Sequence, residues 1–418
     1  MTISARAATI LKDLPRIRGW QEALYRDLHQ HPELSHQEHR TAGIVADQLR
    51  EWGYEVLSGV GGTGVVGLLR SGDGPTVLLR ADMDALPVQE ATGLRYASVV
   101  RATDAEGNDV PVMHACGHDA HVTCLLGAAA LLARNPEQWN GTVIALFQPA
   151  EELGCGAASM VEDRLVELIP PVDVALAQHV GPLPAGLVGT RPGPVMASAD
   201  SLRVTVYGRG SHASMPHNAI DPVVLAAMIV LRLQTIVSRE VDPSQTAVVT
   251  VGSIHAGTKG NVICDHAVLE INVRSYDDEV RATVLDAIRR IVVAECHASG
   301  CSRNPDIEIY GRLSVTVNDD ETTSRVTGAF TEFFGNQFFL IPPVKASEDF
   351  GDIANALGAP YTYWFFGGAN ADQFAQALAA GRVSQDIPVN HAPNFAPIMQ
   401  PTLDTGTQAL VVAALAWL

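Results

Sequence analysis

The hydrophobic residues in the first half of the chain form short continuous runs. Three runs are expected to be strands, at residues 75–81, 142–148 and 173–178. Apolar residues with helical spacing lie before and between them, at residues 5–30, 41–52 and 122–134. Apolar strands that alternate with helices are typical of a mainly parallel sheet covered on both faces. The pattern therefore predicts an α/β domain.

The pattern changes after Gly193-Pro194. Segments typical of strands and helices then follow in the order βαββαβ, at residues 201–207, 221–238, 246–254, 266–275, 278–298 and 307–310. This is the order of a ferredoxin-like domain, in which a four-stranded sheet carries two helices on one face. We predict that residues 197–312 form such an inserted domain, between two parts of a first domain made of residues 1–196 and 313–418.

Length and charge narrow the classes of function. A chain of 418 residues is too long for one ordinary core, which agrees with two domains. Its 28 basic and 46 acidic residues give a net charge of −18, which argues against nucleic acid or an anionic membrane as the main partner. An anionic substrate would need local cations, such as metals or a specific arginine. The six cysteines are too few for a dense disulfide framework, and no apolar signal core begins the chain, so a cytoplasmic location is expected.

Polar residues follow each of the three predicted strands. Asp82 and Asp84 follow the first, Glu151 and Glu152 the second, and His179 the third. Ligands of parallel sheets gather at the carboxyl ends of the strands. Each residue alone could be a helix cap or a loop carboxylate, but their shared position predicts a site.

The richest run of donors is Met113–His121, which offers three imidazoles, one thiol and one carboxylate. Thiolate and neutral imidazole are ligands of zinc-like ions, and Gly117 leaves space between Cys116 and His118. A buried cysteine beside surface histidines is the structural alternative. We interpret the run as part of a two-metal hydrolytic site.

Three residues near the first predicted helix also resemble metal donors, namely His29, His31 and Glu33. Pro32 forces an extended turn there, and no strand end presents these side chains. We therefore predict structural or capping roles for them.

Seven segments together resemble the metallo-amidohydrolases of the aminoacylase and carboxypeptidase superfamily. They are Arg80–Pro87, His114–His121, Gln148–Glu152, Gln178-His179, Gly208–Ala213, Ser347–Phe350 and Asn390-His391. The most similar branch holds hippurate hydrolases, indole-acetyl-amino-acid hydrolases and bacterial N-acyl-amino-acid aminoacylases. The resemblance spans nearly the whole chain, in order. It implies a catalytic domain with a dinuclear metal site and an inserted lid domain that also forms the contact of a homodimer or higher homo-oligomer.

The resemblance also implies a set of ligands. Cys116 is similar to the residue that bridges both metals, and His118, Glu152, His179 and His391 complete the two coordination shells. The cofactors expected are two divalent ions, with zinc favoured by the thiolate and manganese possible.

The two adjacent glutamates can divide their work, because a metal-bound carboxylate stays ionised while its neighbour accepts a proton. Glu151 is thus the expected general base, which activates water for attack on an amide carbonyl and returns the proton to the leaving amine. Asp84 is expected to act in catalysis by orienting a ligand imidazole. Many relatives have histidine at the position of Asp82, and the role of Asp82 stays open.

The inserted domain contributes three further expected residues. His212 resembles the histidine that reaches the metal site of the other subunit and stabilises the oxyanion. Asn261 and Arg274 resemble lid residues that contact the carbonyl and carboxylate of the substrate. Arg274 could instead be a surface charge of a strand, and Cys264 stands where relatives usually have proline.

We predict that the enzyme hydrolyses the amide bond of N-acyl amino acids to a carboxylic acid and a free amino acid. A metallo-exopeptidase acting on short peptides, as a carboxypeptidase or dipeptidase, is the alternative. A cysteine hydrolase using Cys116 and His118 is disfavoured, because positions so close in a tight turn do not easily align imidazole with thiol. A regulatory protein without catalysis would have lost Glu151 or a metal ligand, and neither is lost.

Overall fold

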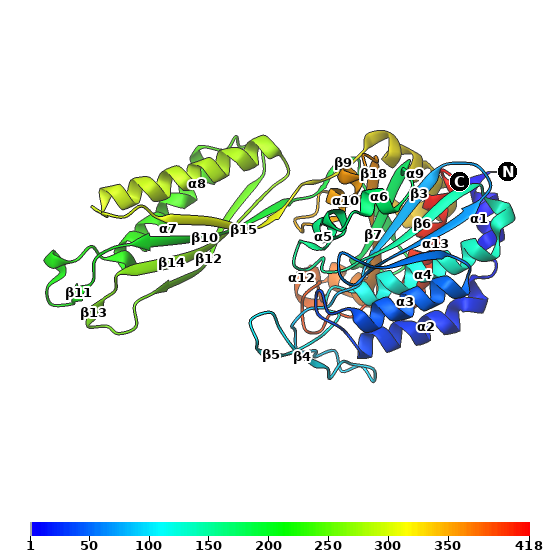
Figure 1. Ribbon diagram of the computed structural model, residues 1–418, viewed down its shortest axis with the longest axis horizontal. Helices are drawn as coiled ribbons and strands as arrows, with labels where there is room; N and C mark the ends of the chain where they lie inside the picture. The colour runs from blue at the N-terminus through cyan, green and yellow to red at the C-terminus, as the bar shows by residue number, and fades with distance from the viewer. Residues whose placement is uncertain (1) are drawn as a thin grey trace. The chain divides into compact units, whose positions relative to one another are not determined.

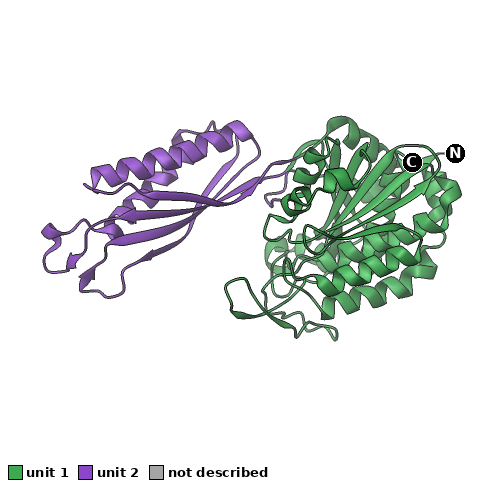
Figure 2. Cartoon of the chain, in the orientation of Figure 1, with its two compact units in different colours: residues 1–195, 317–342, 349–418 green, residues 196–316, 343–348 purple. Residues whose placement is uncertain are grey.

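The computed structural model describes residues 2–418, which divide into two compact units (Figure 2). Unit 1 contains the residues up to Val195, together with Val317–Pro342 and Asp349–Leu418. Unit 2 contains Met196–Thr316 and Pro343–Glu348.

Unit 1 is built on an eight-stranded sheet with the order β1-β2-β6-β3-β7-β18-β8-β17. Strands β3, β6, β7 and β18 of this sheet are labelled in Figure 1. The bounds are β1 Glu55–Val60, β2 Gly64–Ser71, β3 Thr76–Asp82, β6 Gly141–Gln148, β7 Val174–Pro184, β8 Val188–Thr190, β17 Phe338–Leu340 and β18 Tyr361–Ala369. Strands β6, β3, β7 and β18 pair in parallel, whereas β1 and β2 are antiparallel additions. The predicted fold class, a mainly parallel α/β sheet with a smaller antiparallel sheet, is confirmed.

Helix α4 is the central helix of unit 1, because it contacts β3 and packs against α2, α3 and α13. All but its last two residues are buried, as a helix enclosed by other helices and a sheet requires. The helices of this unit are α1 Ile3–Leu11, α2 Leu14–Gln30, α3 His39–Glu51, α4 His118–Arg134, α5 Gly156–Glu162, α6 Leu165–Leu168, α9 Asp320–Phe334, α10 Phe350–Ala356, α11 Ala371–Ala379, α12 Val383–Asp386 and α13 Met399–Leu415.

The single helix expected at residues 5–30 is wrong, because α1 ends at Leu11 and α2 begins at Leu14. Pro15 lies in the first turn of α2. Proline has no N–H to donate to the preceding turn, so it suits a helix start and ends a helix that would continue through it.

Unit 2 is a four-stranded antiparallel sheet with two long helices. Its elements are β10 Ser198–Tyr207, α7 Pro222–Arg239, β12 Ala247–Ala256, β14 His266–Ser275, α8 Asp278–Ala298 and β15 Asp306–Leu313. The strand order β12-β14-β10-β15 places the second, third, first and fourth strands side by side, which is the ferredoxin-like arrangement. A smaller pair of unit 2 is β11 Ser211–His212 with β13 Val262–Ile263. The pair of β9 Gly193–Met196 with β16 Thr316–Asn318 lies where the chain passes between the units, and β4 Arg101–Thr103 pairs with β5 Asp109–Pro111 in unit 1.

The bounds of unit 2 differ from the predicted 197–312, because a later segment returns to it. Strand β15 continues beside β10 until Leu313 pairs with Ala199. The N–H of Ala197 donates to Ala346 O at 2.9 Å, which ties residues 343–348 to this unit.

Helix α7 has an apolar outer face. Val223, Val224, Met228 and Leu231 are exposed by 51%, 58%, 49% and 67%. Among the helices of residues 2–418, α7 alone is long and apolar enough to cross a membrane, and a third (33%) of it is buried in the fold. A row of large apolar side chains on one helix marks a surface suited to binding another apolar surface.

Candidate active site

Six of the predicted site residues of unit 1 lie together near the carboxyl ends of β3, β6 and β7. They are Cys116, His118, Glu151, Glu152, His179 and His391. Asp82 ends β3, and Glu151 follows β6 by three residues. Because these strands are parallel neighbours, their carboxyl ends share one edge of the sheet.

The thiol of Cys116 lies between two imidazoles. Its Sγ is 3.4 Å from Nε2 of His179 and 3.3 Å from Nε2 of His391. Nε2 of His391 is also 3.4 Å from Oε2 of Glu152. Donor atoms of Cys116, Glu152 and His391 lie within 4.8 Å of one another, as do those of His118, Glu151 and Glu152. The two groups share Glu152, so the arrangement offers places for two cations.

The turn between Cys116 and His118 depends on Gly117. This residue has φ of 87°, and a Cβ atom there would lie 2.5 Å from Cγ1 of Val180. Only glycine adopts this conformation in that space without a clash. The turn therefore brings the thiol and the first residue of α4 to the same edge of the site.

One nitrogen of His118 is committed to the protein and the other faces the site. Nδ1 donates to the carbonyl oxygen of Asp84 at 2.9 Å and lies 3.2 Å from its Oδ1. Nε2 has no hydrogen-bond partner within residues 2–418, and the same holds for Oε1 of Glu152, 3.9 Å away. Burying such atoms unpaired costs about 1–3 kcal/mol each. A divalent cation between them would satisfy both, so the residues present fit a metal.

The charges around this point also favour a cation. Burial opposes charge on His118, but Asp82 and Asp84 outweigh it and raise the pKa of His118 to about 10. Burial raises the pKa of Glu152 to about 8. Buried carboxylates thus surround this point, and a cation placed there would offset their negative charge.

His179 presents its lone pair to the site in the same way. Its Nδ1 donates to the carbonyl oxygen of Val180 at 2.7 Å. Burial, with the neighbouring His121, lowers the pKa of His179 well below its usual value. The ring is therefore neutral, and Nε2 is the nitrogen available for a ligand.

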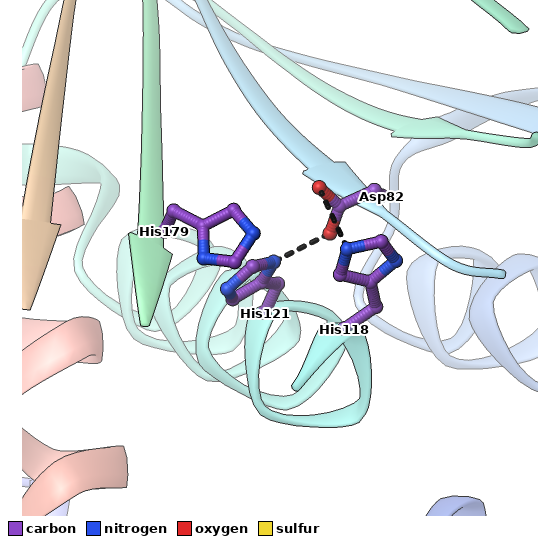
Figure 3. Close-up of side chains that lie close together, drawn as sticks. All are labelled: Asp82, His118, His121 and His179. Carbon is purple, nitrogen blue, oxygen red and sulfur yellow. Dashed lines mark hydrogen bonds and ion pairs between the residues drawn. The ribbon is translucent and has the colours of Figure 1, made fainter. Parts of the chain in front are cut away.

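A second cluster, formed by Asp82, His118, His121 and His179, is drawn in Figure 3. Both ring nitrogens of His121 make hydrogen bonds. Nε2 accepts from the N–H of Val180 at 2.8 Å. Its Nδ1 then carries the proton and donates to Oδ1 of Asp82 at 2.5 Å. His121 has no nitrogen left for a metal, although the cluster has the composition of a metal site.

The open question about Asp82 can be answered from its contacts. Its Oδ2 accepts from Nη1 of Arg80 at 2.6 Å, while its Oδ1 accepts from His121. Asp82 is thus a buried anion held by a guanidinium and an imidazole. Sequence reasoning missed Arg80 and His121 as its partners, although His121 stands one helical turn after His118 on α4.

Asp84 contacts two of the residues expected to be ligands. Its Oδ2 accepts from the hydroxyl of Ser35 at 2.6 Å and from the N–H of Glu152 at 3.0 Å. Through its contact with His118 it links this imidazole to the backbone of Glu152. This is the geometry of a residue that orients ligands.

The turn that carries Glu151 is held by a residue that the sequence did not reveal. Ala150 has φ of 50°, which is unusual for a residue with a side chain. Its N–H donates to Oε1 of the buried Glu38 at 2.9 Å, and the other oxygen of Glu38 accepts from the hydroxyl of Thr63. Oε2 of Glu151 lies 3.9 Å from Nε2 of His118, so this carboxylate lies beside the donors of the candidate site.

The loop before His391 is fastened by Asn390. Its Nδ2 donates to the carbonyl oxygens of Cys116 and Val180, both at 3.1 Å. The N–H of His391 donates to Ala115 O at 2.8 Å. A residue far along the chain is thereby brought beside the thiol, which explains the Asn-His pair noted in the sequence.

The three donors excluded from the metal site have other partners. His29 is buried, with Nδ1 2.6 Å from Asp119 and Nε2 3.1 Å from Glu90. Glu33 accepts from two N–H groups at the start of α3, both at 2.8 Å. His31 is exposed. These contacts agree with the structural and capping roles predicted for them.

The remaining predicted residues lie in unit 2. His212 and Asn261 line one open cavity of about 820 Å³, together with Cys264. Nδ1 of His212 accepts from the N–H of Ser214 at 3.1 Å, and the hydroxyl of Ser214 is 2.7 Å away. A backbone N–H can only donate, so the proton of the neutral ring is on Nε2. Arg274 lines a different pocket of the same unit.

Comparison with known proteins identifies the family. The family described as Peptidase family M20/M25/M40 matches residues 78–387. Thermostable carboxypeptidase 1 of Saccharolobus solfataricus is 39% identical over 86% of this chain and 88% of its own length. Hippurate hydrolase of Campylobacter jejuni is 39% identical over 85% of this chain and 90% of its own.

The chain also resembles a solved structure of Bacillus subtilis YXEP protein, which is described as a dinuclear metal-binding peptidase of the M20 family. The match has a TM-score of 0.76 and 29% identity, and it covers 96% of this chain and 98% of the other. Sequence and structure thus agree over nearly the whole length. The chain belongs to Peptidase family M20/M25/M40 and is a hydrolase of amide bonds.

Proposed function

We propose that this enzyme hydrolyses the amide bond of N-acyl amino acids with the help of two divalent metal ions. The observation that carries the proposal is a pair of buried atoms without a hydrogen-bond partner among the described residues, Nε2 of His118 and Oε1 of Glu152, near the thiol of Cys116. The similarity to a hippurate hydrolase supports an acyl amino acid as substrate.

Cys116, His118, Glu152, His179 and His391 would hold the two ions. When bound, such ions lower the pKa of water and polarise the amide carbonyl. The thiol favours zinc, and manganese is the second choice. Burial and the nearby Glu152 raise the pKa of the Cys116 thiol well above its usual value. The thiol is thus not activated as a nucleophile, and it would ionise only beside a cation.

Glu151 is the proposed general base. It belongs to the group with His118 and Glu152, and we assign it proton transfer because five other residues remain to hold the two ions. The turn at Ala150 keeps Glu151 in place. It accepts the proton of the attacking water and returns it to the nitrogen of the departing amino acid. Asp84 acts as a positioning residue through His118.

His212 is the proposed donor to the oxyanion. Its Nε2 carries the proton because Ser214 donates to Nδ1, and a fixed donor is what a developing oxyanion needs. Asn261, which lines the same cavity, would contact the substrate carbonyl.

We further propose that the enzyme is a homodimer in which unit 2 of one chain completes the site of the other. The apolar face of α7, with Val223, Val224, Met228 and Leu231 exposed, is the proposed contact with a second copy. A symmetric dimer buries the same patch of both copies.

A metallo-exopeptidase is the second candidate function, because a carboxypeptidase is as similar to this chain as a hippurate hydrolase. Both reactions cleave an amide next to a free carboxylate. A panel of N-acyl amino acids and dipeptides separates them, since an exopeptidase would prefer the dipeptides.

Chelation tests the dependence on metal. Dialysis against a strong chelator is expected to abolish hydrolysis of N-acyl amino acids, and zinc or manganese should restore it. Activity is measured by the free amino acid released, and metal content by elemental analysis. A chelated, metal-free sample that keeps full activity would instead support thiol catalysis by Cys116.

Substitution Glu151→Gln tests the general base. Turnover is expected to fall by about 10² to 10⁴, because the carboxamide cannot accept the proton. Metal content should stay equal to that of the wild type, since Glu151 is not a proposed ligand. Glu162→Gln, at an exposed position at the end of α5, is the matched control. Near-normal turnover of the Glu151 variant would refute its role.

Mixing two inactive variants tests whether sites are shared. Glu151→Gln and His212→Ala homodimers should each be nearly inactive. In a mixed dimer, one of the two sites receives intact Glu151 from one chain and intact His212 from the other. Random exchange should therefore recover about a quarter of wild-type activity, because half of the dimers are mixed and each has one intact site. No recovery in exchanged dimers would show that each chain supplies its own His212.

A further inference from the structure

Unit 2 contains a small pocket whose charged residues are both cations. It measures about 320 Å³ and is lined by Ala197, Thr246, Val248, Arg274, Ser275, Tyr276 and Lys345. The chain has 46 acidic and 28 basic residues. A pocket lined by two cationic residues and no acidic residue is therefore unusual in this acidic chain.

The guanidinium of Arg274 is held by neutral acceptors. Its Nε donates to Oδ1 of Asn272 at 3.2 Å, and its Nη1 donates to Lys345 O at 2.8 Å and to Oγ of Ser347 at 3.0 Å. Within residues 2–418 its Nη2 has no hydrogen-bond partner. The fork is thus fixed in position and keeps donor capacity for a ligand.

Lys345 is placed beside this fork by the returning segment 343–348. Met196 forms a parallel bridge with Val344, and the N–H of Ala197 donates to Ala346 O at 2.9 Å. Lys345 therefore lies between two backbone anchors, and its own carbonyl oxygen binds Arg274. Lys345 is exposed and lines the same pocket as Arg274.

Neither cation has a carboxylate partner. No acidic group of the described chain lies within 4.0 Å of the charged nitrogens of Arg274 or Lys345. By contrast, Arg203 and Arg281 of the same unit each make ion pairs. Two like charges that share a pocket repel each other, and a bound anion would remove that repulsion.

We propose that Lys345 is a second carboxylate-binding residue, which together with Arg274 recognises the free carboxylate of the substrate's amino acid. The proposal rests on the proposed function. The planar fork of Arg274 can pair with two carboxylate oxygens, and the flexible ammonium of Lys345 can contact one of them. In a protein of net charge −18, a local positive pocket is also what an anionic substrate needs in order to approach.

The test compares two substrates that share the acyl group and the scissile bond. One is an N-acyl amino acid, and the other is its α-carboxamide, which has no negative charge. In Lys345→Met, KM for the acid should rise about tenfold, because one charge-assisted contact is lost, while kcat and the kinetics of the carboxamide should change less than twofold. Added salt should weaken binding of the acid less in this variant than in the wild type.

Two further variants serve as controls. Lys345→Arg keeps the charge and should keep most of the preference for the acid. Lys12→Met removes an exposed lysine at the end of α1 and should change neither substrate. Thermal unfolding of each variant confirms that the fold is retained.

The results separate the two proposals. If the wild type hydrolyses N-acyl amino acids but Lys345→Met keeps the full preference for the acid, or loses both substrates equally, the role of Lys345 is wrong and the proposed function stands. The same holds if inorganic phosphate binds to the wild type and not to the variant while the preference is unchanged. If the wild type hydrolyses neither substrate, the proposed function itself fails.

Discussion

The site depends on which nitrogen of each histidine is committed to the protein. His118 and His179 each give the Nδ1 proton to an acceptor beside them and keep Nε2 for the site. His121 has both nitrogens in use, because it accepts from Val180 and donates to Asp82. The three imidazoles lie close to one another, but these fixed tautomers decide which of them can bind a metal. Unused lone pairs in a buried place are costly unless a cation meets them.

The fold creates this arrangement by bringing together chain segments that are far apart. The parallel strands β3, β6 and β7 end at one edge, and the glycine turn before α4 brings the thiol of Cys116 to the same edge. Asn390 then fastens the loop of His391 to that turn. Around the ligands, Asp84, Asp82 and Arg80 form buried contacts that hold the imidazoles in place and balance their charge. The expected ligands and the residues that hold them are thus parts of one hydrogen-bond network.

Much of this could be predicted from the sequence. Buried parallel strands are continuous apolar runs in the sequence, so the sheet can be predicted from it. The polar residues directly after these runs can be read from the sequence as well, so the same holds for the expected donors of the site. The two helices of residues 3–30 were merged, because an apolar spacing that continues across Asp13 hides the break. The hydrogen-bond partners Glu38, Arg80 and His121 cannot be predicted in this way. Their contacts are made in the folded chain, and no local sequence pattern indicates which residues they bind. The same is true of segment 343–348, whose return to unit 2 depends on pairing with residues 196 and 197.

The central claim is that Cys116, His118, Glu152, His179 and His391 hold a pair of metal ions, and that Asp82 and His121 do not. Crystals of the metal-loaded enzyme, measured at the absorption edge of the bound metal, test this most directly. The account predicts two anomalous peaks about 3.5–4 Å apart, on either side of Sγ of Cys116 and next to Nε2 of His118 and Nε2 of His391. A single peak enclosed by Asp82, His118, His121 and His179, or no peak in a fully active enzyme, would contradict it.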